Sequence, residues 1–311
     1  MRGGAGACVG TSIAGEHGLF DLPFVYSIVN IFSSLSLAAL LLLSQDQRPP
    51  DQQPGSGGSA FDVDINGNVY VLNPSRNTLQ LFDRAGQLVR EIGGPGWHDS
   101  EFDRPSGVWA RNGIDVFVAD YGNHRIQRFD RTLTFVSSFL TRDNDNPRER
   151  FGFPTDVALS RQGELYLCDS ENGRIVKVDR FTQVERVFGD FGGGKGRLTS
   201  PSRLAVGPAD AVYVIDGDRV VVYDPFGNYE RDLLQGVLHH PEALFAGSDM
   251  IIVADEGTLY FLDGNERPTD AIQVKSLLPQ AQDIRSLNFT DGLLRLLTPN
   301  GIIAVPDPRR K

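Results

Sequence analysis

The chain has 311 residues, of which 40% are hydrophobic and 9% aromatic, so it can form one large all-β domain or two ordinary domains, and wholesale disorder is excluded. The formal net charge of −10 is opposite in sign to that of a typical nucleic-acid-binding protein. Two cysteines, Cys8 and Cys168, are too few for a disulfide-built scaffold. The 34 glycines and 18 prolines favour many short strands joined by tight turns.

The N-terminal region contains a stretch without charges, FVYSIVNIFSSLSLAALLLL, at 24–43. It is about as long as a membrane span, and its second half is similar to the apolar core of a signal peptide, with Ser44 as a small residue at a cleavage site. We therefore interpret 1–43 as a tail with a signal-like or membrane-anchor segment, and the polar residues 44–59 as a flexible linker. The protein is expected to be exported (periplasmic or extracellular) or anchored by one N-terminal segment, with a cytoplasmic protein as the alternative.

A repeat of about forty-odd residues follows the linker and dominates the rest of the chain. Its six copies are Ala60–Gly86, Phe102–Asp130, Phe153–Asp179, Ser200–Asn228, Pro241–Asn265 and Asp283–Val305. The residue that closes the second strand of each copy recurs every 39–49 residues, at Asn73, Asp120, Asp169, Asp216, Asp255 and Thr298. Short β-branched or aromatic strands between Gly, Asn and Asp turns predict an all-β, six-bladed β-propeller over 60–305, with a short C-terminal tail at 306–311.

Closure of the ring leaves two alternatives. The last copy has three recognisable strands, and a fourth would come from 40–44, which has the right separation from Ala60. The same residues cannot be both a cleaved signal core and a closing strand. A three-stranded last blade is therefore expected if the chain is exported.

Two copies carry a motif that resembles the NHL repeat. The second copy contains VFVADYGNHRIQRFD and the third contains LYLCDSENGRIVKVD, whereas the fourth and fifth keep the strand pattern but have DGDR and DEGT at the turn. The chain thus resembles bacterial-type six-bladed NHL proteins with a TolB-like architecture. This resemblance implies a propeller whose loops linking the blades share one face with the loops between second and third strands.

The recurring polar residues of the motif are interpreted as structural. An aspartate after a strand can bond the next backbone amides and hold a turn, and an arginine starting the third strand can pair with it or with a neighbouring carboxylate. The aspartates in question are Asp120, Asp169, Asp216 and Asp255, and the arginines are Arg125, Arg174 and Arg219.

The long linking loops GGPGWHDSEFD, TRDNDNPRERFG and GDFGGGKGRLTS are where recognition is expected, since binding residues concentrate on loops. On the NHL topology, this face carries Arg76, Trp97, His98, His124, Arg148, Arg150, Lys195, Arg197, Arg203, His239 and His240. The leading hypothesis is a non-catalytic scaffold that presents these loops to a protein, peptide or glycan at the cell envelope.

Enzymatic alternatives come from the same resemblance. NHL-related peptidyl-amidoglycolate lyases hold zinc through several histidines over a central channel. The four histidines of the predicted propeller belong to two distant copies and lack a metal-binding spacing. Gluconolactonase-like propellers hold a divalent cation through carboxylates, for which Asp62, Asp64, Asp156 and Glu242 are unevenly placed. No serine-hydrolase elbow occurs. We expect no catalytic residue, no metal and no cofactor, with a metal-dependent lyase or lactonase as the alternative.

Two further roles of NHL proteins are not expected. RNA binding needs an uninterrupted basic face, whereas acidic residues interleave with the arginines and lysines of these loops. The ubiquitin-ligase role needs a cysteine-rich RING pattern, which two cysteines cannot supply.

Overall fold

The computed structural model describes residues 53–279 and 283–310, which belong to a compact unit spanning 46–311. The segment 1–43, the candidate closing strand 40–44 and the first part of the linker lie outside the described residues. In the part of the chain that is described, no helix is long and apolar enough to cross a membrane.

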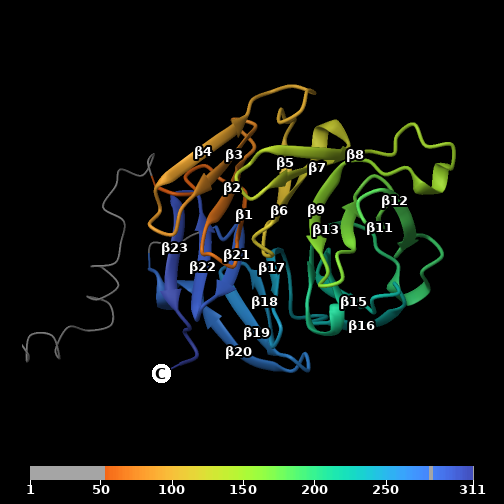
Figure 1. Cartoon of the computed structure of the whole chain (residues 1–311). Coiled ribbons are helices and arrows are strands. Elements are labelled where there is room, and N and C mark those ends of the chain that lie inside the picture. Colours follow the sequence, from red (N-terminus) through yellow and green to blue (C-terminus); the bar gives the residue numbers. More distant parts are fainter. Residues whose placement is uncertain (1–52, 280–282, 311) are drawn as a thin grey trace, which may run out of the picture. The chain divides into compact units, whose positions relative to one another are not determined.

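Within the described ranges, 23 strands form six antiparallel sheets, here called blades 1 to 6 in chain order (Figure 1). Blade 1 contains β1 (Ala60–Val63), β2 (Val69–Asn73), β3 (Thr78–Phe82) and β4 (Leu88–Gly93). Blade 2 contains β5 (Pro105–Trp109), β6 (Asp115–Asp120), β7 (Arg125–Asp130) and β8 (Phe135–Phe139). Blade 3 contains β9 (Pro154–Leu159), β10 (Leu165–Asp169), β11 (Arg174–Asp179) and β12 (Gln183–Phe188).

Blade 4 contains β13 (Pro201–Val206), β14 (Val212–Asp216), β15 (Arg219–Tyr223) and β16 (Tyr229–Leu233). Blade 5 contains β17 (Pro241–Ala246), β18 (Met250–Asp255), β19 (Thr258–Asp263) and β20 (Pro268–Gln273). Blade 6 contains β21 (Ser286–Thr290), β22 (Leu293–Thr298) and β23 (Gly301–Pro306). The loops add single helical turns, namely η2 (Tyr121–Asn123), η3 (Pro147–Glu149), η4 (Gly194–Gly196), η5 (Pro208–Asp210) and α3 (Val274–Leu277).

The first strands form a closed ring around a central axis. In succession β1 contacts β5, β5 contacts β9, β9 contacts β13, β13 contacts β17, β17 contacts β21, and β21 returns to β1. The predicted six-bladed propeller is confirmed, and so is a last blade with three strands among the described residues. All six second strands end at the residues the repeat predicted, because the turn that follows them recurs at nearly constant spacing.

The core lies between the blades, where the second and third strands of neighbouring sheets pack face to face. Tyr70, Tyr166 and Tyr213 occupy the same position in their second strands and are fully buried. Each hydroxyl donates to the outer turn of the following blade, to the carbonyl oxygens of Arg131 and Pro225 and to Glu266 respectively. Burial raises the pKa of all three phenols, so they remain donors at physiological pH. These tyrosines therefore join successive blades by one polar bond inside an apolar contact.

The described part of the expected linker is attached to the last blade. The amide of Ile302 donates to the carbonyl oxygen of Pro54 at 2.8 Å, and Gly57 donates to Pro299 at 3.3 Å. Arg285 also donates to the carbonyl oxygen of Gly58 at 2.9 Å. Residues 53–59 thus belong to the folded ring, in contrast to the free tether expected from their composition.

Candidate functional site

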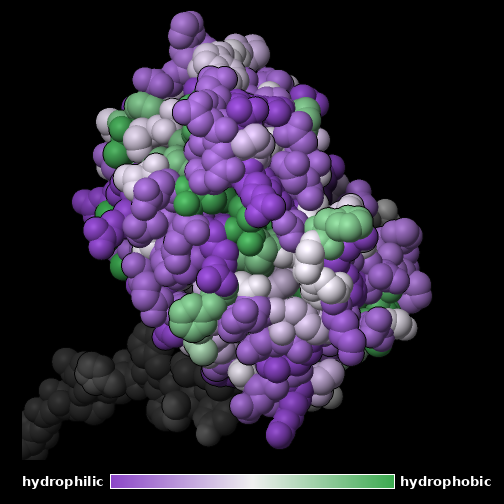
Figure 2. Space-filling view, turned by 90° about the vertical axis from the view of Figure 1, so that its right-hand side faces the viewer, coloured by the Kyte–Doolittle hydropathy of each residue, from purple (hydrophilic) through white to green (hydrophobic). Residues whose placement is uncertain are grey.

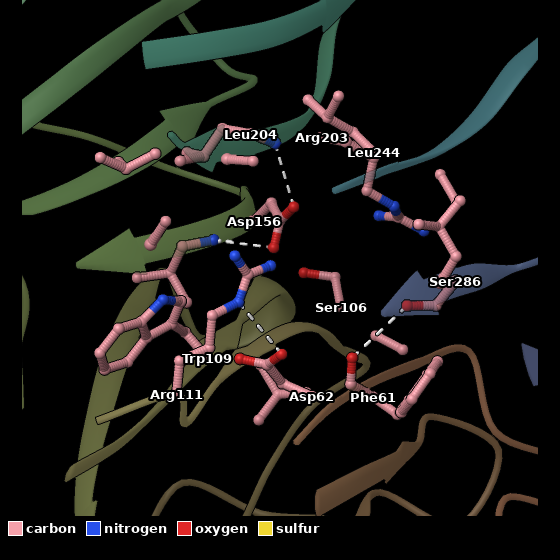
Figure 3. A pocket seen from close by; sticks show the side chains of 18 residues that line it. Phe61, Asp62, Ser106, Trp109, Arg111, Asp156, Arg203, Leu204, Leu244 and Ser286 are labelled. Atoms are coloured by element: carbon pink, nitrogen blue, oxygen red, sulfur yellow. Dashed lines mark hydrogen bonds and ion pairs between the residues drawn. The ribbon is translucent and has the colours of Figure 1, made fainter. Parts of the chain in front are cut away.

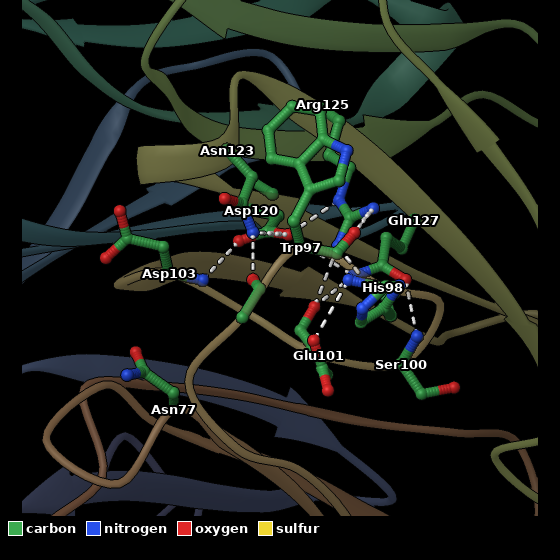
Figure 4. A network of polar contacts seen from close by, with 12 residues as sticks. Asn77, Trp97, His98, Ser100, Glu101, Asp103, Asp120, Asn123, Arg125 and Gln127 are labelled. Carbon is green, nitrogen blue, oxygen red and sulfur yellow. Dashed lines mark hydrogen bonds and ion pairs between the residues drawn. The ribbon is translucent and has the colours of Figure 1, made fainter.

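The loop backbones on one side of the ring are held by a buried ion pair in blade 2 (Figure 4). Asp120, which is fully buried, accepts from the amide of Asp103 at 2.8 Å and from Arg125 Nε at 2.8 Å. The remaining Arg125 nitrogens donate to the carbonyl oxygens of Trp97 (2.7 Å), His98 (3.0 Å) and Glu101 (2.9 Å). Both halves of the pair bond to the loop that enters the blade, and Asp120 also accepts from the Asn123 side chain in the turn that follows at 2.9 Å, so the pair fixes the incoming loop and joins it to that turn. We call this arrangement the loop clamp.

The clamp recurs with fewer parts around the ring. In blade 3, Asp169 accepts from the Gly152 amide and pairs with Arg174, which donates to the carbonyl oxygen of Arg150. In blade 4, Asp216 accepts from the amides of Thr199 and Ser200. It pairs with Arg219, which also donates to the carbonyl oxygen of Arg197.

In blade 5, Asp255 accepts from the amides of His239 and His240, and a threonine, Thr258, stands at the position of the arginine. The arginines therefore pair with the aspartates named from the sequence. The backbone amides that these aspartates accept from lie 15 to 17 residues earlier in the chain and not directly after the strand as expected. In the turn after the strand, Asp120 and Asp169 accept from the side chains of Asn123 and Asn172.

The predicted recognition residues lie at this loop face, with their side chains mostly exposed. Trp97 is 53% exposed, and the Arg125 guanidinium lies 5.1 Å from its ring centroid. Arg197 lies 4.4 Å from the ring of Phe191, which is 84% exposed. Arg148 and Lys195 lie in the exposed turns η3 and η4, while Arg76 pairs with Glu91 at 2.7 Å.

The four histidines of the propeller do not converge. His124 contacts Arg142 at 3.0 Å and accepts from the Phe153 amide at 3.1 Å, between blades 2 and 3. His98 lies in the loop before blade 2, whereas His239 and His240 lie before blade 5, on the opposite side of the ring. Over 53–279 and 283–310, no group of three or more His, Cys, Asp or Glu residues could hold a metal ion.

The central channel is crossed by Arg111, which follows the first strand of blade 2 (Figure 3). Its Nη1 donates to the carbonyl oxygen of Ala246 in blade 5 at 2.7 Å, and its Nε lies 3.3 Å from Asp62 in blade 1. The guanidinium also lies 4.6 Å from the ring centroid of Phe245. The cavity left inside the channel has a volume of about 40 Å³. This is room for a few water molecules at most, since one water needs at least about 10–15 Å³ of such volume.

The carboxylates considered for a cation site are separated or already bonded. Asp62 also accepts from the amide of Ala110 and the side chain of Asn288. Asp64 accepts from the backbone within the first turn of blade 1. Asp156 faces the channel, and burial raises its pKa to about 6, although the nearby Arg203 charge lowers it.

A larger pocket opens at the mouth of the channel, on the same side as the linking loops. Its volume is about 450 Å³, and it is lined by Ser59, Ser202, Arg203, Pro241, Glu242, Asp283 and Arg285. These residues come from the starts of the first strands of blades 4 and 5 and from the residues that enter β21 and β1. The sequence pointed to Arg203 and Glu242, but Ser59, Asp283 and Arg285 join them only because the ring closes. We call this the mouth pocket.

A groove lies on the rim between blades 3 and 4. Figure 2 shows this side of the molecule, whose surface is mostly hydrophilic with small apolar areas. The groove measures about 340 Å³ and is lined by Arg186, Val187, Phe188, Gly189, Asp190, Gly192, Gly193, Tyr223, Gly227 and Tyr229. Gly189 has a φ of +78°, and a Cβ there would lie 2.8 Å from Leu198, so this turn requires glycine. No sequence signal distinguishes the groove from an ordinary loop.

Comparison with known proteins supports the repeat assignment. The NHL repeat model matches residues 151–178, within blade 3 and the loop before it. The chain is 28% identical over 120 residues to a Caenorhabditis elegans protein named "probable peptidyl-alpha-hydroxyglycine alpha-amidating lyase", covering 37% of this chain and 32% of that protein. It is 23% identical over 188 residues to NHL repeat-containing protein 3 of Homo sapiens, covering 54% and 52%.

Solved structures show the same fold at lower identity. An inactive virginiamycin B lyase from Staphylococcus aureus, crystallised with quinupristin, is similar with a TM-score of 0.58 over 80% of each chain, at 14% identity. The chain spans about half or less of the length of the curated relatives it matches. The ring of six sheets, the repeated Asp–Arg motif and these matches identify the chain as an NHL-repeat β-propeller.

Proposed function

We propose that this propeller is a non-catalytic binding scaffold that presents its loop face to a protein or peptide partner at the cell envelope. One observation carries the proposal, namely the side chain of Arg111 that crosses the channel from blade 2 to blade 5. Small-molecule sites typically measure about 300–1,000 Å³, so a channel with about 40 Å³ of free volume has no room for a substrate. The space available to a ligand is at the mouth and on the loops.

The loop face has the composition of a recognition surface. Binding energy at protein interfaces is concentrated in Trp, Tyr and Arg side chains held on rigid supports. Here the loop clamp fixes the backbone at Trp97, and Arg125 supports the exposed indole ring from below. Phe191 and Arg197 form a second exposed aromatic–cation pair on the loop before blade 4. The uncharged stretch at 24–43 supports placing this surface at the cell envelope.

Affinity capture from envelope fractions tests the proposal. The full chain would be compared with a Trp97→Ala/Phe191→Ala variant and with a Phe226→Ala control. Phe226 is 66% exposed and lies in the turn between β15 and β16, on the face of the ring away from the linking loops. We expect the native chain and the Phe226 variant to retain one stoichiometric partner and the double variant to lose it. Equal capture by all three proteins, or no partner at all, would contradict the proposal.

The alternative is a metal-dependent lyase or lactonase-like enzyme, which is favoured by the similarity to two proteins named as lyases. Metal analysis of the purified full chain separates the two functions. A stoichiometric zinc or calcium ion that is lost on His98→Ala or His124→Ala substitution would favour the enzyme. A chain that retains no metal after dialysis, yet binds its partner, would favour the scaffold.

A further inference from the structure

The mouth pocket contains four charged side chains, and within the described residues none of them has an ion-pair partner within 4.0 Å. Two are cationic (Arg203 and Arg285) and two are anionic (Glu242 and Asp283). A pocket of this size at the axis of the ring is accessible from the loop face. Its ligand preference therefore depends on which sign of charge is already compensated by the protein.

Both arginines interact with groups outside the pocket. Arg285 donates from Nη1 to the carbonyl oxygen of Gly58 at 2.9 Å, which satisfies part of its guanidinium. Arg203 borders both the mouth pocket and the channel, where its charge acts on Asp156 and lowers the pKa of that carboxyl against the effect of burial. Each arginine thus already interacts with a group that does not line the mouth pocket, Gly58 for Arg285 and Asp156 for Arg203.

The carboxylates of Glu242 and Asp283 form no ion pair within the described residues. Burial raises the pKa of Glu242, and the charges of Asp283, Asp255 and Glu256 raise it further, while His240 lowers it. The hydroxyl oxygen of Ser59, which also lines the pocket, is buried and has no hydrogen-bond partner among the described residues. A ligand group that donates hydrogen bonds and carries positive charge would satisfy all three groups.

We propose that the mouth pocket binds a cationic group of the partner, either a lysine or arginine side chain or a free amino terminus, between Glu242 and Asp283. The inference rests on the proposed function and assigns the chemistry of its central contact. Ser59 accepts a hydrogen bond from the same group, and Arg203 closes the pocket on the side of the channel.

Three tripeptide amides test the assignment by calorimetric titration of the full chain at low ionic strength. Ac-Gly-Arg-Gly-NH₂ carries only a side-chain cation, H-Gly-Gly-Gly-NH₂ only an amino terminus, and Ac-Gly-Glu-Gly-NH₂ only an anion. We expect one of the two cationic peptides to bind and the acidic peptide not to bind. Glu242→Gln and Asp283→Asn should each weaken that binding by about fivefold or more, since each removes a charge-assisted contact. Arg203→Gln should leave it unchanged or tighter.

The matched control is Glu149→Gln, which removes one negative charge from the loop before blade 3, outside the pocket. Thermal unfolding of each variant verifies that it is folded. Four outcomes would each overturn the assignment. The acidic peptide could bind, both cationic peptides could fail to bind, Glu242→Gln could bind the cationic peptide as well as the native chain does, or stoichiometric Ca²⁺ could displace the peptide. These outcomes are independent of the capture experiment, because loss of Trp97 and Phe191 leaves the pocket intact.

Discussion

Blades 2 and 5 face each other across the ring and hold the backbone of their incoming loops with different residues. In blade 2, Asp120 and Arg125 form a buried pair that bonds to four backbone groups of the incoming loop. In blade 5, Asp255 alone accepts from two amides, and the loop that enters the blade is shorter, since the loop from β4 to β5 spans 94–104 and the loop from β16 to β17 only 234–240. The difference indicates that the aspartate is the minimal element of the repeat and that the arginine serves longer loops.

Removal of the aspartate should separate the two blades most clearly. Asp120→Ala leaves Arg125 buried without its counter-charge, which should lower the free energy of unfolding by about 3–5 kcal/mol. Asp255→Ala leaves only backbone amides unpaired and should cost about 1–2 kcal/mol. Urea unfolding of both variants measures the difference. Equal losses would mean that the arginine adds nothing to the clamp.

This comparison also marks what the sequence could and could not predict. The aspartates and arginines were recognised as partners because they recur at fixed positions, and the same regularity located every second-strand end. The amides they hold, the crossing by Arg111 and the mouth pocket were not predicted. Each depends on residues that the closed ring brings together over long sequence separations, such as Arg111 with Ala246 and Ser59 with Asp283. No single-copy motif encodes such contacts.

Loss of the arginine tests the clamp from its other side. Arg125→Met keeps the apolar stem but leaves Asp120 buried without its counter-charge. It also leaves the carbonyl oxygens of Trp97, His98 and Glu101 without their donor. We expect a loss of about 3 kcal/mol in the free energy of unfolding, because Asp120 keeps its other hydrogen-bond donors. Trp97 also loses the cation beneath its ring, whereas the other tryptophan, Trp109, is only 8% exposed. We expect the intrinsic fluorescence to shift to the red. An unchanged spectrum together with native stability would show that the loop is held by other contacts.

Arg111 joins the two compared blades directly, and its removal should have a smaller effect. Arg111→Met breaks the bond to the Ala246 carbonyl oxygen in blade 5, while Asp62 keeps its bonds from Ala110 and Asn288. We expect a loss of about 1–2 kcal/mol in the free energy of unfolding. The crystal structure of the variant should show a wider channel filled by ordered water. A channel of unchanged width would contradict the assignment of Arg111 as its plug.

Acidification should loosen the loop that leaves blade 2 while sparing the loop that enters blade 5, and this is the smallest of the expected effects. Burial lowers the pKa of His124, and the charge of Arg142 lowers it further, so folding favours the neutral imidazole. The stabilisation is present above the ordinary histidine pKa of 6.5 and is lost as the pH falls below it.

Protonation of His124 would also remove the ring nitrogen that accepts from the Phe153 amide. The amides of His239 and His240 are held instead by the side chain of Asp255, and no histidine ring nitrogen takes part in these bonds. Hydrogen exchange between pH 7.5 and 5.5, corrected for intrinsic rates, should therefore show loss of protection at Phe153 and none at His240. His124→Gln should abolish the pH dependence at Phe153, and equal loosening of both loops would place its origin outside the His124 contact.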